Sequence, residues 1–249
     1  MSLERANAAA AEPLLRVEGL VKRFGAFRAL DGLNFHLMPG EILGLVGPNG
    51  SGKTTCINVI SGLYPPDGGT LVYAGREIGG LKSHRLVHLG INRTFQVPKP
   101  FLTLTVKENV EVAATYGGRN GATFDIAGLL ASLELDSQAA RPAAELNSVQ
   151  QKMLDLARAL ATGPRLLCVD ELAAGLNPAE LDRVAERLKA LARGGVALLV
   201  VEHLMGFIDQ VTDRVIVLNA GREIFEGVLA DAVKDRQVVE VFLGTENGG

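Results

Sequence analysis

A glycine-rich loop places the strongest constraint on how this chain folds. Residues 47–54 read Gly-Pro-Asn-Gly-Ser-Gly-Lys-Thr, with the apolar run 42–46 before them and residues 55–60 after them. This order indicates a strand, a tight turn and a helix start, the context that a G-x-x-x-x-G-K-[ST] loop requires. Glycines let such a backbone curl and point its N–H groups at a phosphate, beside the positive end of the helix dipole. The loop therefore predicts a phosphate site, and a plain glycine turn before a helix is the weaker interpretation.

Two side chains of the loop add specific chemistry to these N–H groups. Lys53 supplies a positive charge for the β- and γ-phosphates of a nucleotide, and the Thr54 hydroxyl can ligate Mg²⁺. The residues of this segment expected to contact the nucleotide are Gly47, Pro48, Asn49, Gly50, Ser51, Gly52, Lys53, Thr54 and Thr55.

The composition narrows the function classes that remain. The 249 residues carry a net charge of −3, whereas a dedicated nucleic-acid binder is usually basic, so no nucleic-acid partner is expected. No segment approaches the roughly 18 apolar residues that a bilayer-spanning helix needs, so any membrane role must come through a partner. The two cysteines, Cys56 and Cys168, lie in apolar runs and are expected to be buried, reduced thiols of a cytosolic protein.

Strand-like and helix-like segments alternate along the chain. Strands are expected at 14–17, 29–37, 41–46, 70–73, 76–78, 165–169, 196–201 and 214–218. Helices are expected from the loop to about residue 63 and at 106–115, 126–133, 148–161 and 179–192. This alternation favours an α/β fold with a mainly parallel sheet covered by helices on both faces.

One stretch departs from the alternation, because its expected helices are not separated by strands. Pro98 and Pro100 break the chain at its start. We interpret about 97–162 as a helical subdomain inserted into a single domain, whose core is 13–96 and 163–249. Residues 1–12 are Ala-rich, lack the apolar core of a signal peptide and are expected to form a disordered tail.

Acidic residues follow the strand expected at 165–169. The carboxyl ends of parallel strands meet at one sheet edge, so Asp170 and Glu171 should lie beside the phosphate loop. Asp170 can then hold Mg²⁺ through its water shell, and Glu171 can orient and polarise an attacking water. A pair of solvated carboxylates at a strand end is the plainer alternative.

A histidine follows the next expected strand. Residues 197–201 lead into Glu202 and His203, which places His203 at the same sheet edge, facing the γ-phosphate. His84 and His88 lie four residues apart on a possible helix, but no third ligand is evident, so they are expected to be surface residues.

The order and spacing of these segments resemble the ATP-binding subunit of an ABC transporter, from about residue 14 to 244. The resemblance implies a P-loop NTPase core, with an antiparallel β part near the N-terminus and an inserted helical subdomain. It implies ATP and Mg²⁺ as ligands, and ATP hydrolysis coupled to solute transport. The implied roles are adenine stacking for Phe24, the Walker A loop for 47–54, the Q-loop with Mg²⁺ contact for Gln96, Walker B for 166–171 with Glu171 catalytic, the D-loop for Asn177 and the switch histidine for His203.

Several runs are similar to one subgroup, the importers of branched-chain amino acids. They are residues 91–96, 104–109, 173–178 and 201–203. The resemblance implies membrane-spanning permease partners, an extracytoplasmic solute-binding protein and a peripheral position on the cytoplasmic face of the membrane. The segment 96–107, with Phe101 and Leu102, is the expected permease contact, unless these two side chains are ordinary core. An importer of other amino acids, of urea or of an amide remains an alternative.

One segment departs from the family pattern. Where such subunits carry Leu-Ser-Gly-Gly-Gln, this chain has Leu146 followed by the expected signature residues Asn147, Ser148, Val149 and Gln150. In the family this segment binds the γ-phosphate held by the other subunit of a dimer. Asn147 can still donate a hydrogen bond, whereas the branched Val149 crowds a backbone that should lie against phosphate.

The altered signature favours a heterodimer with an ATPase of normal signature over a homodimer. A signature that tolerates the change is the competing interpretation. A catalytically weak, nucleotide-gated regulatory subunit is the alternative function, although Glu171 and His203 argue against it. A soluble ABC protein of DNA repair or translation would need a long coiled coil or tandem cassettes, and the sequence shows neither.

Overall fold

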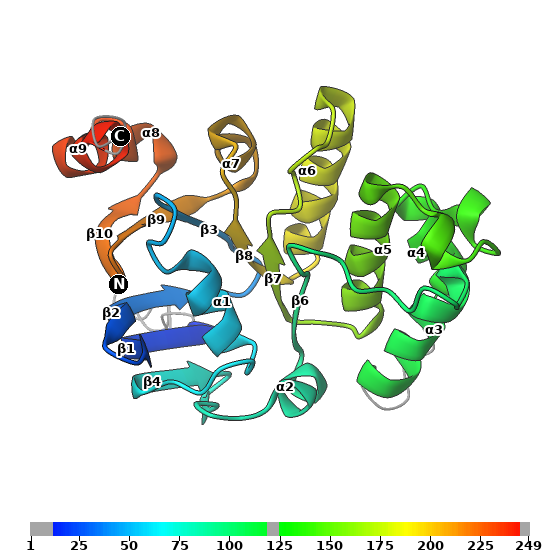
Figure 1. Ribbon diagram of the computed structural model, residues 1–249, viewed down its shortest axis with the longest axis horizontal. Coiled ribbons are helices and arrows are strands. Elements are labelled where there is room, and N and C mark those ends of the chain that lie inside the picture. Colours follow the sequence, from blue (N-terminus) through cyan, green and yellow to red (C-terminus); the bar gives the residue numbers. More distant parts are fainter. Residues whose placement is uncertain (1–11, 119–124, 245–249) are drawn as a thin grey trace, which may run out of the picture.

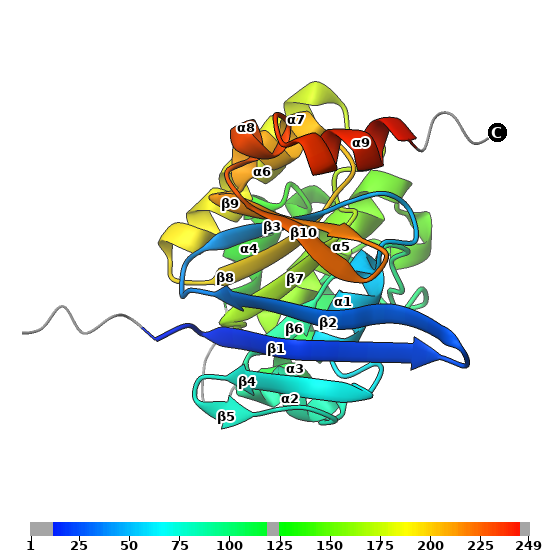
Figure 2. The same ribbon diagram turned by 90° about the vertical axis from the view of Figure 1, so that its left-hand side faces the viewer.

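Two β-sheets organise the fold of this computed structural model, which describes residues 12–118 and 125–244 (Figure 1). Apart from Glu12, the tail expected at residues 1–12 lies outside the described part. The first sheet is antiparallel and has the order β2-β1-β4-β5 (Figure 2). Its strands are β1 (Leu15–Phe24), β2 (Phe27–Leu37), β4 (Gly68–Tyr73) and β5 (Arg76–Glu77). This is the antiparallel part implied for the N-terminal region.

The second sheet has six strands in the order β10-β9-β3-β8-β7-β6. They are β3 (Ile42–Val46), β6 (Ile91–Arg93), β7 (Leu166–Asp170), β8 (Ala197–Val201), β9 (Arg214–Asn219) and β10 (Arg222–Gly227). All neighbours pair in parallel except β9 and β10, which form a hairpin. The predicted mainly parallel α/β sheet is confirmed, whereas the edge strand β10 was not expected.

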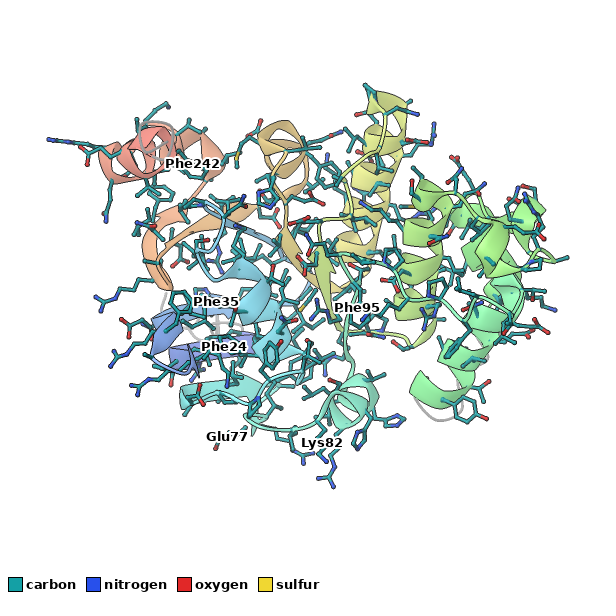
Figure 3. The ribbon with its side chains drawn as sticks, in the orientation of Figure 1. Phe24, Phe35, Glu77, Lys82, Phe95 and Phe242 are labelled. Atoms are coloured by element: carbon teal, nitrogen blue, oxygen red, sulfur yellow. The ribbon has the colours of Figure 1, made fainter. Side chains whose placement is uncertain are left out.

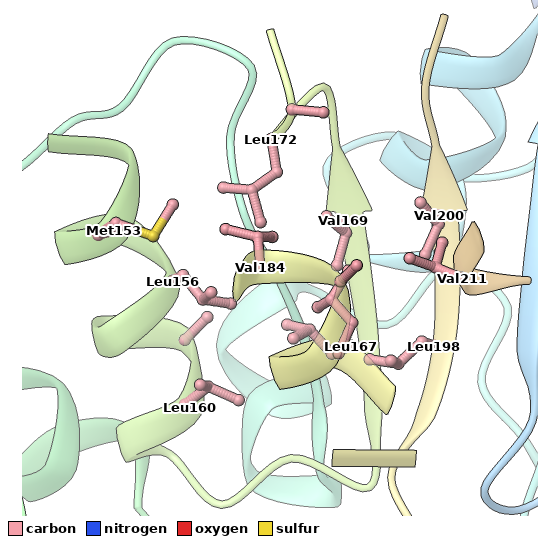
Figure 4. Packing of buried hydrophobic residues seen from close by; sticks show 14 of the residues in the cluster. Met153, Leu156, Leu160, Leu167, Val169, Leu172, Val184, Leu198, Val200 and Val211 are labelled. Carbon is pink, nitrogen blue, oxygen red and sulfur yellow. The ribbon is translucent and has the colours of Figure 1, made fainter. Parts of the chain in front are cut away.

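The central strands are buried on both faces, and successive side chains enter two different cores. Leu43 and Leu45 of β3 join the core that contains α1 (Lys53–Ile60) and the antiparallel sheet, while Ile42 and Val46 join the other. Figure 4 shows the second core, where helices α5 (Ser148–Ala161) and α6 (Pro178–Arg193) pack against β7 and β8. The two faces are therefore covered differently, one by α1 with the antiparallel sheet and the other by helices alone.

Helices gather between β6 and β7 and lie at the right of Figure 1. They are α3 (Val106–Gly117), α4 (Ile126–Ser132) and α5, with 3₁₀ turns at Asp136–Gln138 and Ala143–Glu145. α3 begins with a capping box, because Thr105 and Glu108 exchange side-chain and main-chain hydrogen bonds. These helices occupy the stretch that the sequence marks as helical, and α3 packs against α5.

The remaining helices lie outside this group. α2 (Ser83–Leu89) precedes β6, α7 (Met205–Val211) follows β8, and α8 (Leu229–Ala232) and α9 (Arg236–Gly244) follow β10. No sequence expectation covered α8 or α9. Across the described ranges, no helix combines the length and the apolar character needed to cross a membrane.

Both cysteines are fully buried free thiols, as expected. Burial raises the pKa of the Cys168 thiol to about 12, and burial also raises the pKa of Cys56. Neither thiol therefore ionises at neutral pH, so neither can act as a nucleophile there.

Candidate functional site

The residues expected to bind the nucleotide phosphates and to act on them meet at the edge where β3, β7 and β8 end. They surround a cavity of about 340 Å³ between the phosphate loop and the strand ends. Its lining consists of Phe24, Phe27, Ala29, Asn49, Gly50, Gly52, Lys53, Thr54, Thr55, Gln96, Glu171 and His203. Glu171 and His203 share this cavity with the phosphate loop because the parallel sheet gathers its strand ends at one edge. Phe24 and Phe27 reach it from the β1–β2 hairpin of the antiparallel sheet.

The loop before α1 has a backbone that only glycine fits at two positions. Gly47 and Gly52 have φ angles of 146° and 110°. A Cβ at Gly47 would lie 2.2 Å from the Leu218 carbonyl oxygen, and a Cβ at Gly52 would lie 2.5 Å from that of Ala29. Among the described residues, no side chain caps the first turn of α1, and that turn contains no acidic residue. The N–H groups at this end of the helix are therefore available to an anionic ligand.

Lys53 is folded back into the loop that it follows. Its Nζ donates hydrogen bonds to the carbonyl oxygens of Gly47, at 2.8 Å, and of Pro48, at 2.9 Å. Burial lowers the pKa of Lys53, and the charges of Glu171 and Asp170 oppose that change. The ammonium group is thus held inside the curl of the loop, where a phosphate bound by the N–H groups would meet it.

Glu171 lies at a junction between three loops. Its Oε2 accepts a hydrogen bond from Gln96 Nε2 at 2.7 Å, and its Oε1 lies 2.9 Å from His203 Nε2. Its backbone is left-handed, with a φ of 49°, and its N–H donates to the Val201 carbonyl at 2.9 Å. A non-glycine residue adopts this conformation only where its surroundings hold it there. The Glu171 carboxylate therefore lies at the phosphate cavity, in contact with the side chains of Gln96 and His203.

Asp170 is buried beside Glu171 and keeps one oxygen unpaired. Its Oδ2 lies 3.2 Å from Arg93 Nη2, while Oδ1 has no hydrogen-bond partner among the described residues. Burial raises the pKa of Asp170, and Arg93 opposes that change. A buried, unpaired carboxylate oxygen is costly unless a ligand or water satisfies it.

The oxygen donors of this site suit Mg²⁺. Thr54 is exposed at the cavity, Gln96 lines it, and Asp170 lies behind Glu171. Within the described ranges, no three His, Cys, Asp or Glu side chains form a ready metal cage. Mg²⁺ commonly binds through one or two protein oxygens, water and substrate phosphates, so a sparse donor set of this kind fits.

Two aromatic rings border the far side of the cavity. Phe24 is 44% exposed and packs edge-on against Tyr64, with 5.3 Å between ring centroids (Figure 3). Phe27 is 61% exposed and pairs with Phe24 across the β1–β2 hairpin. Either exposed ring can stack on a nucleotide base. The sequence predicted Phe24 but not Phe27, although both flank the same Gly-Ala turn.

The signature residues lie outside this cavity, at the start of α5. Asn147 caps the helix, its Oδ1 accepting from Gln150 N at 2.8 Å, and Gln150 Oε1 accepts from Asn147 N at 3.1 Å. Ser148 is exposed, while Val149 is half-buried in a separate cavity with Met153 and Leu176. The phosphate loop and the signature of one chain thus form two separate surfaces.

Asn177 also acts as a helix cap. Its Oδ1 accepts from Glu180 N at 3.0 Å, and the Glu180 carboxylate accepts from Asn177 N at 2.7 Å, so the pair starts α6. Like the signature, Asn177 does not line the phosphate cavity.

Three charged residues near the site carry no sequence prediction. Arg93 pairs with Asp170, Glu202 is buried and accepts from Ala173 N at 2.6 Å, and Lys152 donates to main-chain oxygens of the segment after β7. Arg93 lies three positions before Gln96, which offers a faint signal. Nothing in the spacing of Lys152 or Glu202 predicts their contacts.

Comparison with known proteins agrees with this geometry. The pattern described as ABC transporter matches residues 30–174. The chain is 36% identical to the probable branched-chain amino acid transport ATP-binding protein LivG of Archaeoglobus fulgidus, over 94% of this chain and 96% of that protein. Its fold superposes on a nucleotide-free ATP-binding cassette from an ABC transporter, with a TM-score of 0.84, 31% identity and coverage of 93% and 99% of the two chains.

A third relative was captured as a dimer. It is the ATP-binding cassette MJ0796 in a post-hydrolysis state bound to ADP and Pi, with a TM-score of 0.78, 26% identity and coverage of 86% and 98%. With a family match over more than half of its length and a relative above 30% identity, the chain belongs to the ABC transporter family and is one of its ATP-binding cassettes.

Proposed function

We propose that this chain binds and hydrolyses ATP as a subunit of an importer for branched-chain or other amino acids, and drives transport through membrane-spanning partner subunits. The observation that carries the proposal is the Glu171 carboxylate, held by Gln96 and His203 at the mouth of the phosphate loop. The amino-acid substrate is supported by the name of the archaeal relative, whose similarity extends over nearly the full length of both chains.

The chain's own residues divide the chemistry among them. The loop 47–52 and the start of α1 would bind the β- and γ-phosphates through main-chain N–H groups, with Lys53 adding positive charge. Thr54, Gln96 and, through water, Asp170 would hold Mg²⁺, which neutralises phosphate charge. Glu171 would orient the water that attacks the γ-phosphorus, and His203 would hold Glu171 and contact the γ-phosphate.

Release of Gln96 links binding to catalysis in this scheme. Glu171 already uses one oxygen for Gln96 and the other for His203. Each carboxylate oxygen can still accept a hydrogen bond from a water. A bound γ-phosphate would compete for Gln96 and His203 and so leave the carboxylate freer to orient that water. ATP binding would thereby free Glu171 at the moment when the water is needed.

Transport assays test the substrate. The chain would be assembled in liposomes with permease subunits of an amino-acid importer, a second ATPase of normal signature and a matching solute-binding protein. ATP-dependent uptake of leucine or isoleucine supports the proposal. Uptake of urea or a short amide instead would move the chain to a different importer, and absence of ATP hydrolysis in the complete complex would refute the enzymatic function.

We propose a heterodimer, because the two halves of a composite ATP site are unequally built in this chain. The phosphate loop, Glu171 and His203 match the family pattern, whereas Asn147 and Val149 do not. A homodimer would pair two altered signatures. The test compares the rate of ATP hydrolysis by the pure chain with the rate of a complex in which the partner ATPase carries the Leu-Ser-Gly-Gly-Gln signature. Equal activity per site would favour a tolerant signature and a homodimer.

A regulatory subunit without turnover is less well supported, because Glu171, Gln96 and His203 are all present and in contact.

Contact with permease subunits on the cytoplasmic face is supported by the segment 96–107. Phe101 and Leu102 are 47% and 53% exposed, so they are not ordinary core. Phe101 borders a cavity of about 300 Å³ with Tyr116 and Arg158, between the sheet and the helical part. Replacing both exposed side chains by serine should weaken assembly with the permease and leave ATP binding intact.

A further inference from the structure

Helix α5 contacts both loops that carry the Glu171 junction. Lys152, in the second turn, donates to the carbonyl oxygens of Glu171 at 2.9 Å and Ala174 at 2.6 Å, with Leu172 at 3.4 Å. Three residues further along, Asp155 accepts from the main-chain N–H of Phe95 at 2.7 Å, directly before Gln96. One helix therefore holds the main chain that follows Glu171 and the main chain directly before its partner Gln96.

The Lys152 contacts fall on the most strained part of the site. Glu171 has a left-handed backbone, a conformation that a glutamate keeps only under external constraint. Its N–H is held by the Val201 carbonyl and its C=O by the Lys152 ammonium, so both sides of the residue are fixed. From the opposite side, the buried Glu202 carboxylate holds the N–H of Ala173. The segment 171–174 is thus clamped between a cation from α5 and an anion from the end of β8.

A lysine is suited to this task. Its ammonium group carries three donors, and three carbonyl oxygens converge on it in this fold. Charge-assisted hydrogen bonds are stronger than neutral ones, so one side chain can order a whole turn. The turn directly before Lys152 is Asn147–Gln150, the surface expected to face a partner's nucleotide.

We propose that Lys152 is a positioning residue that sets the conformation of Glu171, and that it ties the chain's own hydrolytic carboxylate to the helix bearing its signature. This inference rests on the proposed ATPase function. It adds that a displacement of α5 acts on Glu171 through a single ammonium group. Lys152 itself does not line the phosphate cavity, so it acts through Glu171 and not on ATP.

The test compares Lys152→Met, which keeps most of the length of the side chain but removes its donors, with Lys152→Arg, which keeps the charge. Lys234→Met is the matched control, since Lys234 is exposed and, among the described residues, its side chain pairs only with Asp231, at 3.8 Å. In the complex with its partner subunits, Lys152→Met should lower kcat by about 10- to 100-fold, because a small misplacement of a catalytic group has effects of this size. The Kd for MgATP should stay within about twofold, and Lys152→Arg should recover most of kcat.

Hydrogen–deuterium exchange on the chain alone supplies a readout that needs no ATPase activity. In Lys152→Met, amides of 170–176 should exchange faster, while those of the β9–β10 hairpin should match the wild type and Lys234→Met. Unchanged exchange at 170–176 with kcat within about twofold would overturn the inference. So would faster exchange throughout the chain together with equal losses of ATP binding and kcat that Lys152→Arg fails to restore. If the wild-type complex does not hydrolyse ATP, the proposed function fails, and the exchange data alone decide the role of Lys152.

Discussion

The helix after the phosphate loop and the helix after the signature segment begin in opposite ways. α1 follows Gly52, and no side chain hydrogen-bonds to its first turn. α5 follows Asn147, which forms a capping box with Gln150, so the cap N–H and the third helical N–H are both satisfied within the chain. Capping boxes also start α3 and α6. Within the described part of the chain, α2, α7 and α8 also start without a side-chain cap. The start of α1 differs from theirs because a glycine loop and a cavity lie in front of it.

This difference distinguishes the start of α1, which can bind an anion, from the start of α5, which its own cap stabilises. An uncapped helix start exposes N–H donors and costs stability until an anion arrives, whereas a capping residue contributes about 1 kcal/mol to the helix itself. A phosphate that approached α5 would find fewer unused main-chain donors and a branched Val149 in place of glycine. The comparison agrees with the proposal that this chain uses a partner's signature better than it supplies its own.

The largest expected effect concerns catalysis at the phosphate cavity beside the start of α1. Glu171→Gln should lower the rate of ATP hydrolysis by about 10²- to 10⁴-fold, because the amide cannot act as a base toward the attacking water. ATP affinity should remain close to that of the wild type, since the phosphate loop is untouched. Phosphate release and equilibrium binding of ATP measure the two quantities. Comparable losses in both would show that Glu171 supports binding, contrary to its proposed role in orienting water.

The second expected effect concerns the charge beside the uncapped helix. Lys53→Ala should weaken ATP binding by roughly 10- to 100-fold, because it removes a charged hydrogen-bond donor to the phosphates. Isothermal titration with MgATP measures the change, and Lys234→Ala serves as the exposed control. Undiminished affinity would mean that the N–H groups of the loop suffice without the ammonium group.

A smaller effect is expected from repairing the signature. The triple change Asn147→Ser, Ser148→Gly and Val149→Gly restores the family pattern and removes the crowding branches. Steady-state ATP hydrolysis by the chain alone should rise by about tenfold, a change of about 1.4 kcal/mol in the barrier. The same change combined with Glu171→Gln provides the inactive control. An unaltered rate would favour the tolerant signature and remove the argument for a heterodimer.

The capping role of Asn147 can be measured by itself. Asn147→Ala should lower the free energy of unfolding by about 0.5–2 kcal/mol, because it leaves the first turn of α5 without its cap. Urea denaturation of the chain alone measures this loss. Asn147→Ser, which can still cap, should lose less. If Asn147→Ala leaves stability unchanged, the contrast between the two helix starts would lose its energetic basis.

The smallest expected effect is a pH dependence of the free energy of unfolding that comes from Glu202, which holds the N–H of Ala173. Burial raises the pKa of Glu202 above its ordinary value of 4.5, with the Ala173 N–H and the Lys152 charge opposing that change. A raised pKa in the folded state means that the stability contributed by the protonated form is present below pH 4.5 and is lost as the pH rises through the folded pKa. Glu202→Gln is neutral throughout, so its stability relative to the wild type should increase from pH 4.5 upward and then level off. Urea midpoints across this range measure the gap, and a gap that narrows with rising pH would mean that the pKa of Glu202 is lowered by folding instead.

Much of the site followed from short stretches of sequence. The loop 47–54 needs particular residues at fixed spacing, and close backbone contacts require glycine at positions 47 and 52. Asp170, Glu171 and His203 could be predicted because each follows an apolar strand, and parallel strands end at one edge. The β10 strand escaped prediction because its side chains are all half-buried or exposed and do not alternate with buried ones.

The sequence by itself determined that the chain binds a nucleotide phosphate and that its core is a mainly parallel α/β sheet, because both depend on local spacing and on the period of apolar residues. Only the tertiary structure decided which polar groups meet. Arg93 reaches Asp170 across 77 positions, Lys152 reaches Glu171 across 19, and Gln96 reaches Glu171 across 75. Such pairings depend on the strand order and on how α5 packs beside β7, and no local pattern encodes either. The physical reason is that such contacts depend on how close two groups lie in space. The strand order and the packing of α5 set that distance.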